Sequence, residues 1–138
     1  MLDIRVTLRP GPFSRGAGRI PYEAIARSVL GKKYELSLVL CGDDLARRMN
    51  RLYRKKTYRP NVLSFPLSKE EGEIFLNARA AAREARRYGV PLRDRLALLF
   101  VHGCFHVKGL RHGRIMEQQE QRVLRVFGFS CNGHSTQE

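Results

Sequence analysis

The stretch from Leu92 to Gly113 constrains the fold of this chain more than any other. Its first part is apolar nearly all round a helix, with Leu96, Leu99 and Phe100 among its side chains. A helix that is apolar on every side is buried rather than placed at a surface. We therefore expect a long central helix in the core, which gives the residues that follow it a rigid base.

Three histidines follow directly, in the order H-x-x-x-H-x-x-G-x-x-H. His102 and His106 are four residues apart, so on a helix they project from one face about one turn apart. Gly109 can adopt the left-handed conformation that ends a helix and turns the chain back, which would bring His112 toward the other two. Three neutral imidazoles with a fourth position open suit zinc. We predict that these histidines bind one zinc ion and take part in catalysis.

The competing interpretation is that each histidine is an ordinary core residue, as a lone histidine on an apolar helix usually is. Three of the four histidines of the chain within eleven residues favour the metal site instead. The fourth, His134, sits in an expected loose tail from Ser130 to Glu138 and is not a predicted ligand. Metalloproteases with this spacing carry a glutamate after the first histidine as general base, whereas here the residue is Gly103. Peptide hydrolysis is therefore disfavoured.

The charge balance points to a polyanionic partner. Twenty-six basic residues stand against thirteen acidic ones, which gives a formal net charge of +13. Such an excess is the electrostatic footprint of a nucleic-acid-binding protein, although a merely soluble basic surface would give the same count. The three cysteines Cys41, Cys104 and Cys131 show no C-x-x-C spacing, so neither a disulfide framework nor a cysteine zinc site is expected. Cys104 is expected in the core. No secretory signal or membrane span is expected, and the cytoplasm is the expected compartment.

Hydrophobic periodicity predicts an α+β fold. We expect strands over Met1–Arg9, Glu35–Cys41, Val62–Leu67 and Gly72–Asn77, and helices over 21–30, from Asp43 or Asp44 (as cap), over Ala78–Tyr88, from Leu92, and over Ile115–Phe127. These elements predict one domain over residues 1–138, with a small mixed sheet of about four strands packed with about five helices and the metal site on the buried central helix.

Smaller features of these helices are also predicted. Leu45, Met49 and Leu52 recur at helical spacing and are expected to point inward. Asn77 is expected to cap the helix that follows it. Glu117 and Glu120 lie near the start of the last helix, where the helix dipole favours acidic residues.

A basic run from Tyr53 to Arg59 follows the second predicted helix. It is either a solvated helix end, since cations favour helix C-termini, or a phosphate clamp. In the second case Tyr53 and Tyr58 are available to stack on bases. Composition alone leaves both interpretations open.

The sequence HGCFHVKGLRH, residues 102–112, resembles the H-G-x-L-H-L-x-G-Y-D-H signature of the YbeY family of bacterial endoribonucleases and ribosomal RNA maturation factors. The three histidines and both internal glycines match. Phe105 and Val107 replace leucines with other apolar residues. Leu110 and Arg111 stand where tyrosine and aspartate are usual, and the second change reverses a charge next to His112.

A second stretch carries the same resemblance. The segment NVLSFP from Asn61 to Pro66 matches the family's T-N-V-L-S-F-P, with Pro60 in place of threonine, and Tyr53-Arg54 matches its tyrosine-arginine pair. The arginine of that pair is functional in the family, which implies a catalytic role for Arg54. A guanidinium is chemically suited to it, because its planar fork stabilises negative charge developing on a phosphorus centre.

The resemblance implies a zinc-dependent endoribonuclease, specific for single-stranded RNA, that acts in ribosomal RNA maturation and ribosome quality control. Its implied partners are ribosomal RNA and the ribosome or its small subunit. The attacking group is open: it is either an activated water or the 2′-hydroxyl of the RNA itself.

Two other functions are compatible with the residues. One is a non-catalytic, ribosome-associated RNA-binding or assembly factor with a structural zinc, which the missing general base favours. The other is a metallo-hydrolase of small phosphoesters, which would leave the basic excess unused. The resemblance, rather than the chemistry of the residues, favours the endoribonuclease.

Overall fold

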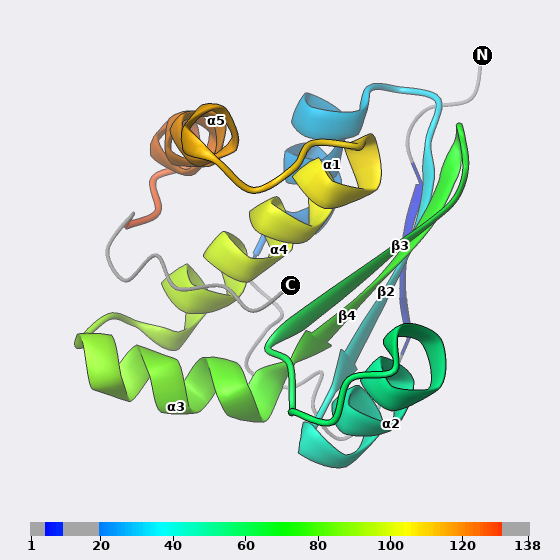
Figure 1. Cartoon of the computed structure of the whole chain (residues 1–138). Coiled ribbons are helices and arrows are strands. Elements are labelled where there is room, and N and C mark those ends of the chain that lie inside the picture. The colour runs from blue at the N-terminus through cyan, green and yellow to red at the C-terminus, as the bar shows by residue number, and fades with distance from the viewer. Residues whose placement is uncertain (1–4, 10–19, 131–138) are drawn as a thin grey trace.

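The computed structural model describes residues 5–9 and 20–130. Within them the chain forms, in order, β1 (Arg5–Arg9), α1 (Tyr22–Leu30), β2 (Glu35–Cys41), α2 (Asp43–Arg54), β3 (Val62–Ser68), β4 (Glu71–Asn77), α3 (Ala78–Tyr88), α4 (Leu92–Lys108) and α5 (Arg114–Val126) (Figure 1). The start of the expected N-terminal strand, Cys131 and His134 lie outside the described residues. No helix in the described ranges is both long and apolar enough to span a membrane.

The strands form one mixed sheet in the order β1-β2-β4-β3. β2 pairs in parallel with both β1 and β4, whereas β3 pairs antiparallel with β4. The predicted α+β class with a small mixed sheet and five helices is therefore confirmed. β3 lies at an edge of the sheet, which explains how it continues through Pro66, because an edge strand tolerates a residue without an N–H donor. Its register with β4 shifts between Pro66 and Ser68.

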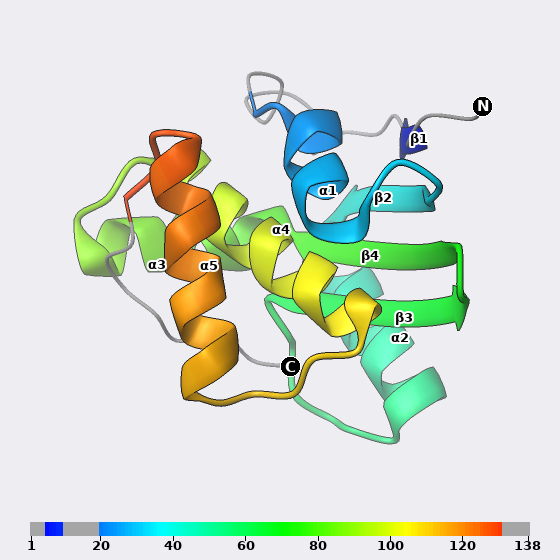
Figure 2. The same ribbon diagram turned by 90° about the horizontal axis from the view of Figure 1, so that it is seen from above.

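The sheet separates two apolar clusters. α1 and α4 lie on one face, and α2 lies on the other, as Figure 2 shows. Alternate residues of β2 face opposite sides: Leu36, Leu38 and Leu40 belong to the larger cluster, and Val39 and Cys41 to the smaller one. This period of two is what a strand buried on both faces requires.

α4 is the centre of the larger cluster, as predicted. Every residue from Asp94 to Phe105 is buried, and α1, α3 and α5 pack around the helix. The ring of Tyr22 on α1 meets that of Phe100 edge to face at 4.9 Å between centroids. Cys104 is fully buried, which confirms its place in the core, and this burial raises the pKa of its thiol.

A buried ion pair ties α4 to its neighbours. The side chain of Arg95 is completely buried, and its Nη2 lies 2.7 Å from Oε1 of Glu84 on α3. The guanidinium also lies over the ring of Tyr88, 5.0 Å from its centroid. Asn61 donates from Nδ2 to Glu84 Oε2 at 3.2 Å. A buried charge is stable only when it is paired and hydrogen-bonded, so this network fixes α3, α4 and the start of β3 relative to one another.

Two predictions for α2 were wrong. Leu45 and Met49 pack on the smaller cluster, but Leu52 is 64% exposed. The apolar repeat of α2 thus runs one turn beyond the cluster that it packs against. Neither aspartate caps the helix: the N-cap residue is Gly42, and α2 begins at Asp43.

The carboxylate of Asp43 pairs with α3 instead. Its two oxygens accept hydrogen bonds of 2.8 Å from Nη1 and Nη2 of Arg83, and Asn77 donates to Oδ1 at 2.9 Å. The predicted cap of α3 is confirmed, because Asn77 Oδ1 accepts from the N–H of Ala80 at 3.1 Å. Asn77 therefore both starts α3 and joins it to α2.

Candidate metal centre

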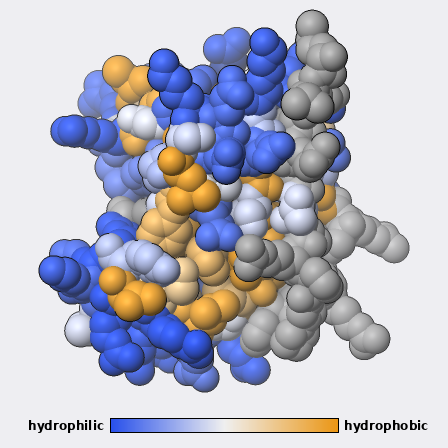
Figure 3. All heavy atoms as spheres, turned by 90° about the vertical axis from the view of Figure 1, so that its right-hand side faces the viewer, coloured by the Kyte–Doolittle hydropathy of each residue, from blue (hydrophilic) through white to orange (hydrophobic). Residues whose placement is uncertain are grey.

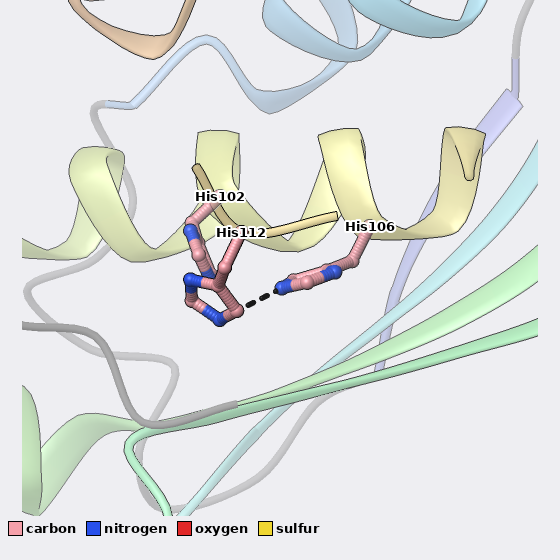
Figure 4. A group of neighbouring side chains, drawn as sticks. All are labelled: His102, His106 and His112. Carbon is pink, nitrogen blue, oxygen red and sulfur yellow. Dashed lines mark hydrogen bonds between the residues drawn. The ribbon is translucent and has the colours of Figure 1, made fainter. Parts of the chain in front are cut away.

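The three histidines predicted as ligands lie together. His102 and His106 project from α4, and the chain then turns at Gly109, which has a φ of 110° and a left-handed conformation as expected. The turn brings His112 back, so that the three rings converge on one side of the helix (Figure 4). The centroids of the rings are 4.5, 4.7 and 4.8 Å apart, and one nitrogen from each ring lies within 4.8 Å of the others.

The spacing of the nitrogens fits a shared ion. Nε2 of His106 lies 3.2 Å from Nε2 of His112. Zinc bonds to imidazole nitrogen are about 2.0–2.1 Å long, so two such nitrogens on a tetrahedral ion are separated by about 3.3 Å. Within residues 5–9 and 20–130 this is the one group of three or more histidine, cysteine or acidic side chains with a geometry that could hold a metal.

The cluster has a closed side and an open side. His102 is buried, His106 half-buried and His112 exposed. A cavity of about 320 Å³ opens beside His102 and His112. The remaining residues that line it come from the start of α5 and the residue before it: Gly113, Arg114, Met116, Glu117 and Glu120. A ligand can therefore approach from the side of the exposed His112, while His102 lies at the buried base of the site.

The protonation state of His106 suits a metal ligand. Burial is the largest cause that lowers the pKa of His106, to about 4, and the nearby His102, His112 and Arg54 lower it further. At neutral pH this imidazole is therefore neutral, and a neutral ring keeps the lone pair that a metal needs.

The structure explains why glycine follows the first histidine. A Cβ added at Gly103 would lie 3.0 Å from Oγ of Ser64 and 3.1 Å from Cδ1 of Ile74. α4 thus packs closely on β3 and β4 here, and any side chain larger than that of glycine requires Ser64 and Ile74 to move by a few tenths of an ångström. Glycine at this position thus suits the close packing of helix on sheet, and Ser64 of the NVLSFP segment is one of the contacts.

Glu120 also lies at the site, a position that was not predicted from the sequence. This residue of α5 is 5% exposed, and its Oε2 lies 2.5 Å from Nδ1 of His102. A signal was present in the sequence, because Met116, Glu120 and Leu124 recur every four residues. Met116 and Leu124 are both buried, so Glu120 places a carboxylate on the apolar face of an otherwise amphipathic helix.

Arg54 is brought close to the histidines from another element. It is the last residue of α2, and Lys55 then turns the chain with a φ of 57° in the left-handed region. The side chain of Arg54 is half-buried, and its charge contributes to the low pKa of His106. Its Nη1 is buried with no hydrogen-bond partner in the described part of the chain. A buried guanidinium nitrogen without a protein partner is suited to an anion that enters the site.

Arg54 belongs to a strongly basic stretch of the chain with many exposed cations, here called the basic surface. The exposed cations of this basic surface lie on α2 and the segment that follows it: Arg47, Arg48, Arg51, Lys55, Lys56 and Arg59. Tyr53 and Tyr58 lie among them, 62% and 41% exposed. The segment is anchored where Asn50 donates from Nδ2 to the carbonyl of Tyr58 at 3.1 Å. Figure 3 views the side of the molecule on which α2 lies, where apolar side chains gather between hydrophilic ones.

The fold and the cluster define an α+β protein with a candidate three-histidine metal centre. Residues 15–128 match the family model described as endoribonuclease YbeY. The chain is 33% identical to the endoribonuclease YbeY of Aromatoleum aromaticum, over 91% of this chain and 90% of that protein. It is 34% identical to that of Geobacter sulfurreducens, over 96% of this chain and 98% of the relative. The chain therefore belongs to the endoribonuclease YbeY family.

A solved structure agrees with the fold. The solution structure of a Thermotoga maritima protein matches with a TM-score of 0.62 over 91% of this chain and 89% of that one, at 22% identity. At this identity the match concerns the arrangement of the elements rather than the chemistry of the site.

Proposed function

We propose that this chain is a metal-dependent endoribonuclease, specific for single-stranded RNA, that acts in ribosomal RNA maturation and ribosome quality control. The observation that carries the proposal is the convergence of three histidines, each with a nitrogen within 4.8 Å of the others, close to Arg54. Membership of the endoribonuclease family supports it. We also propose that residues 1–138 form one domain and that the protein works in the cytoplasm.

In this proposal His102, His106 and His112 hold one metal ion, and zinc fits the all-imidazole donor set best. A bound zinc ion would supply Lewis-acid stabilisation of a phosphoryl oxygen and would lower the pKa of a water ligand. Arg54 presents its guanidinium to the scissile phosphate and stabilises the negative charge that grows there. The half-burial of Arg54 strengthens this interaction, because charges attract more strongly where water is excluded.

The basic surface holds the RNA backbone in the same proposal. The lysines and arginines around Arg54 pair with phosphates, while the exposed rings of Tyr53 and Tyr58 stack on bases. Stacking on a protein ring requires a base that is not already stacked in a duplex, which is why we propose single-stranded RNA as the substrate. The ribosome or its small subunit is the proposed source of that RNA.

The attacking group remains one of two in this proposal, and the products distinguish them. Attack by the 2′-hydroxyl forms a 2′,3′-cyclic phosphate and releases a 5′-hydroxyl. Attack by water leaves a phosphate on one of the new ends and a hydroxyl on the other. A substrate with a single 2′-deoxy nucleotide at the cleavage position separates the two, because only the first route needs that hydroxyl.

The test compares zinc-loaded protein, chelator-treated protein and His106→Ala on single-stranded and duplex RNA of the same sequence. We expect cleavage of the single strand by the loaded protein, and neither cleavage after chelation nor cleavage by the variant. A folded, zinc-containing protein that binds RNA and never cleaves it would contradict the proposal. It would favour an RNA-binding assembly factor with a structural zinc. Turnover of a small phosphoester that RNA does not inhibit would favour the general metallo-hydrolase.

A further inference from the structure

Glu120 is the one charged residue of α5 that is buried. It lies on the buried face of that helix between Met116 and Leu124, and its side chain is 7% exposed. Burying a carboxylate costs several kcal/mol unless a partner offsets the loss of water. The partner is the ring of His102, whose Nδ1 lies 2.5 Å from Glu120 Oε2 and whose side chain is 2% exposed. The most buried candidate ligand is therefore held by a carboxylate from another helix.

This contact determines which nitrogen of His102 can bind a metal. With Nδ1 engaged by Glu120, Nε2 is the nitrogen that remains for a metal bond, and it too is buried. Turning the ring over would put a carbon against the carboxylate and lose the contact. We propose that Glu120 is a positioning residue: it fixes the ring of His102 with Nε2 as the ligand atom and so sets metal affinity and coordination geometry. The inference rests on the proposed metal site.

The position of α5 extends the argument to a second ligand. α5 carries none of the three histidines, but it begins at Arg114, two residues after His112. The packing of α5 on α4 therefore affects two candidate ligands. It positions His112 because that residue lies just before α5 in the chain, and it positions His102 because Glu120 contacts it. Carboxylates that hold a ligand histidine in this way typically contribute a factor of about 10–100 to metal affinity.

The test is the zinc affinity of Glu120→Gln, measured by competition with a chromophoric chelator. Glutamine keeps the size of the side chain and removes its charge. The matched control is Glu23→Gln, which removes the same charge from an exposed position on α1 that does not line the cavity. We expect zinc affinity to fall about 10–100-fold in Glu120→Gln. In the control we expect a change of no more than about twofold, as for other exposed charges. Cobalt substituted for zinc should show altered visible bands in Glu120→Gln alone.

A merely structural role would give a different result. The two variants would then bind zinc equally and share the cobalt spectrum of the wild type, while metal-free Glu120→Gln unfolded at lower temperature. That outcome would overturn the inference. A wild type that binds no zinc at all would instead contradict the proposed function, and the two failures are thus distinguishable.

If Glu120→Gln does not fold, the wild type itself provides the test. Long-range proton–nitrogen spectra of the zinc-loaded protein should show His102 with a proton on Nδ1 and the metal on Nε2. The opposite assignment, with the proton on Nε2, would overturn the inference.

Discussion

α4 and α2 each bring candidate functional residues to the site, but the two helices are built differently. From Asp94 to Phe105 α4 is buried without interruption, and it carries two of the candidate ligands. α2 buries only Ala46 and Asn50 fully, turns arginines to solvent and ends at Arg54. A metal needs donors fixed to within a fraction of an ångström, and close packing supplies that. A polyanion needs charge over a wide surface, which exposed cations supply.

The comparison predicts that substitutions in α4 change stability and the geometry of the metal site. Substitutions in α2 should instead change RNA binding and cleavage. The following experiments can break or sharpen that division, beginning with the largest expected effect.

Gly103→Glu should destabilise the protein most. The new side chain must enter a contact where even a Cβ lies 3.0 Å from Ser64 Oγ, and it carries a charge into an apolar region. We expect the free energy of unfolding to fall by about 4 kcal/mol or more, measured by urea denaturation. Gln118→Glu adds the same charge at an exposed position of α5 and should change it by less than about 0.5 kcal/mol. Equal stability of the two variants would refute the packing argument.

Arg95→Met should have the next largest effect on stability. Methionine fills much of the space but leaves Glu84 without its buried cation. We expect a loss of about 3 kcal/mol in the free energy of unfolding, with zinc stoichiometry unchanged while the protein is folded. Arg87→Met, at an exposed site on α3, is the control. Loss of zinc from folded Arg95→Met would show that the network also shapes the metal centre.

Arg54→Lys should slow RNA cleavage and leave the fold intact. Lysine keeps the charge but not the planar fork that faces a phosphate. We expect the cleavage rate to fall about 100-fold while the Kd for RNA stays nearly constant. Arg51→Lys, one turn earlier and exposed, should change neither the cleavage rate nor the Kd for RNA. If both variants weakened RNA binding equally and left the cleavage rate unchanged, Arg54 would contribute only general charge to RNA binding and would have no catalytic role.

Asp43→Asn should have the smallest effect, and one that depends on pH. Hydrogen bonds from the Arg83 guanidinium, helped by Asn77, hold the pKa of Asp43 well below its usual range. A depressed pKa contributes stability above the ordinary value near 4 and loses it as the pH falls toward the folded value. Because Arg83 is 45% exposed, we expect about 1 kcal/mol at pH 6.

The measurement is the free energy of unfolding of the wild type minus that of Asp43→Asn, followed from pH 6 downward. The difference should shrink below about pH 4. Asp44→Asn is the exposed neighbour and serves as control. A difference that grew as the pH fell would contradict the assigned sign.

Much of the site was predictable because its chemistry is local in the sequence. The spacing of His102 and His106 and the turn at Gly109 depend on helix geometry and on one left-handed glycine. The uninterrupted apolar run before them predicted a buried helix. The burial of α4 from Asp94 to Phe105 confirms that prediction.

What the sequence did not reveal depends on contacts between distant segments. Glu120 is eighteen residues from His102 and on another helix, so its role becomes visible only when α5 packs on α4. The exposure of Leu52 depends on how far the smaller cluster extends beneath α2, which helical periodicity does not encode. The carboxylate of Asp43 was expected to cap α2. It pairs instead with Arg83, which lies forty residues away on α3.

The most direct test of the account is the metal content of untagged, purified protein. Elemental analysis of the wild type should find about one equivalent of zinc, as a three-imidazole site predicts. Folded His106→Ala should have lost it, and Glu23→Gln, at an exposed position on α1, should keep it. A wild type that is folded, free of metal and unable to take up zinc would contradict the central claim. It would leave a basic RNA-binding domain in place of a metallo-endoribonuclease.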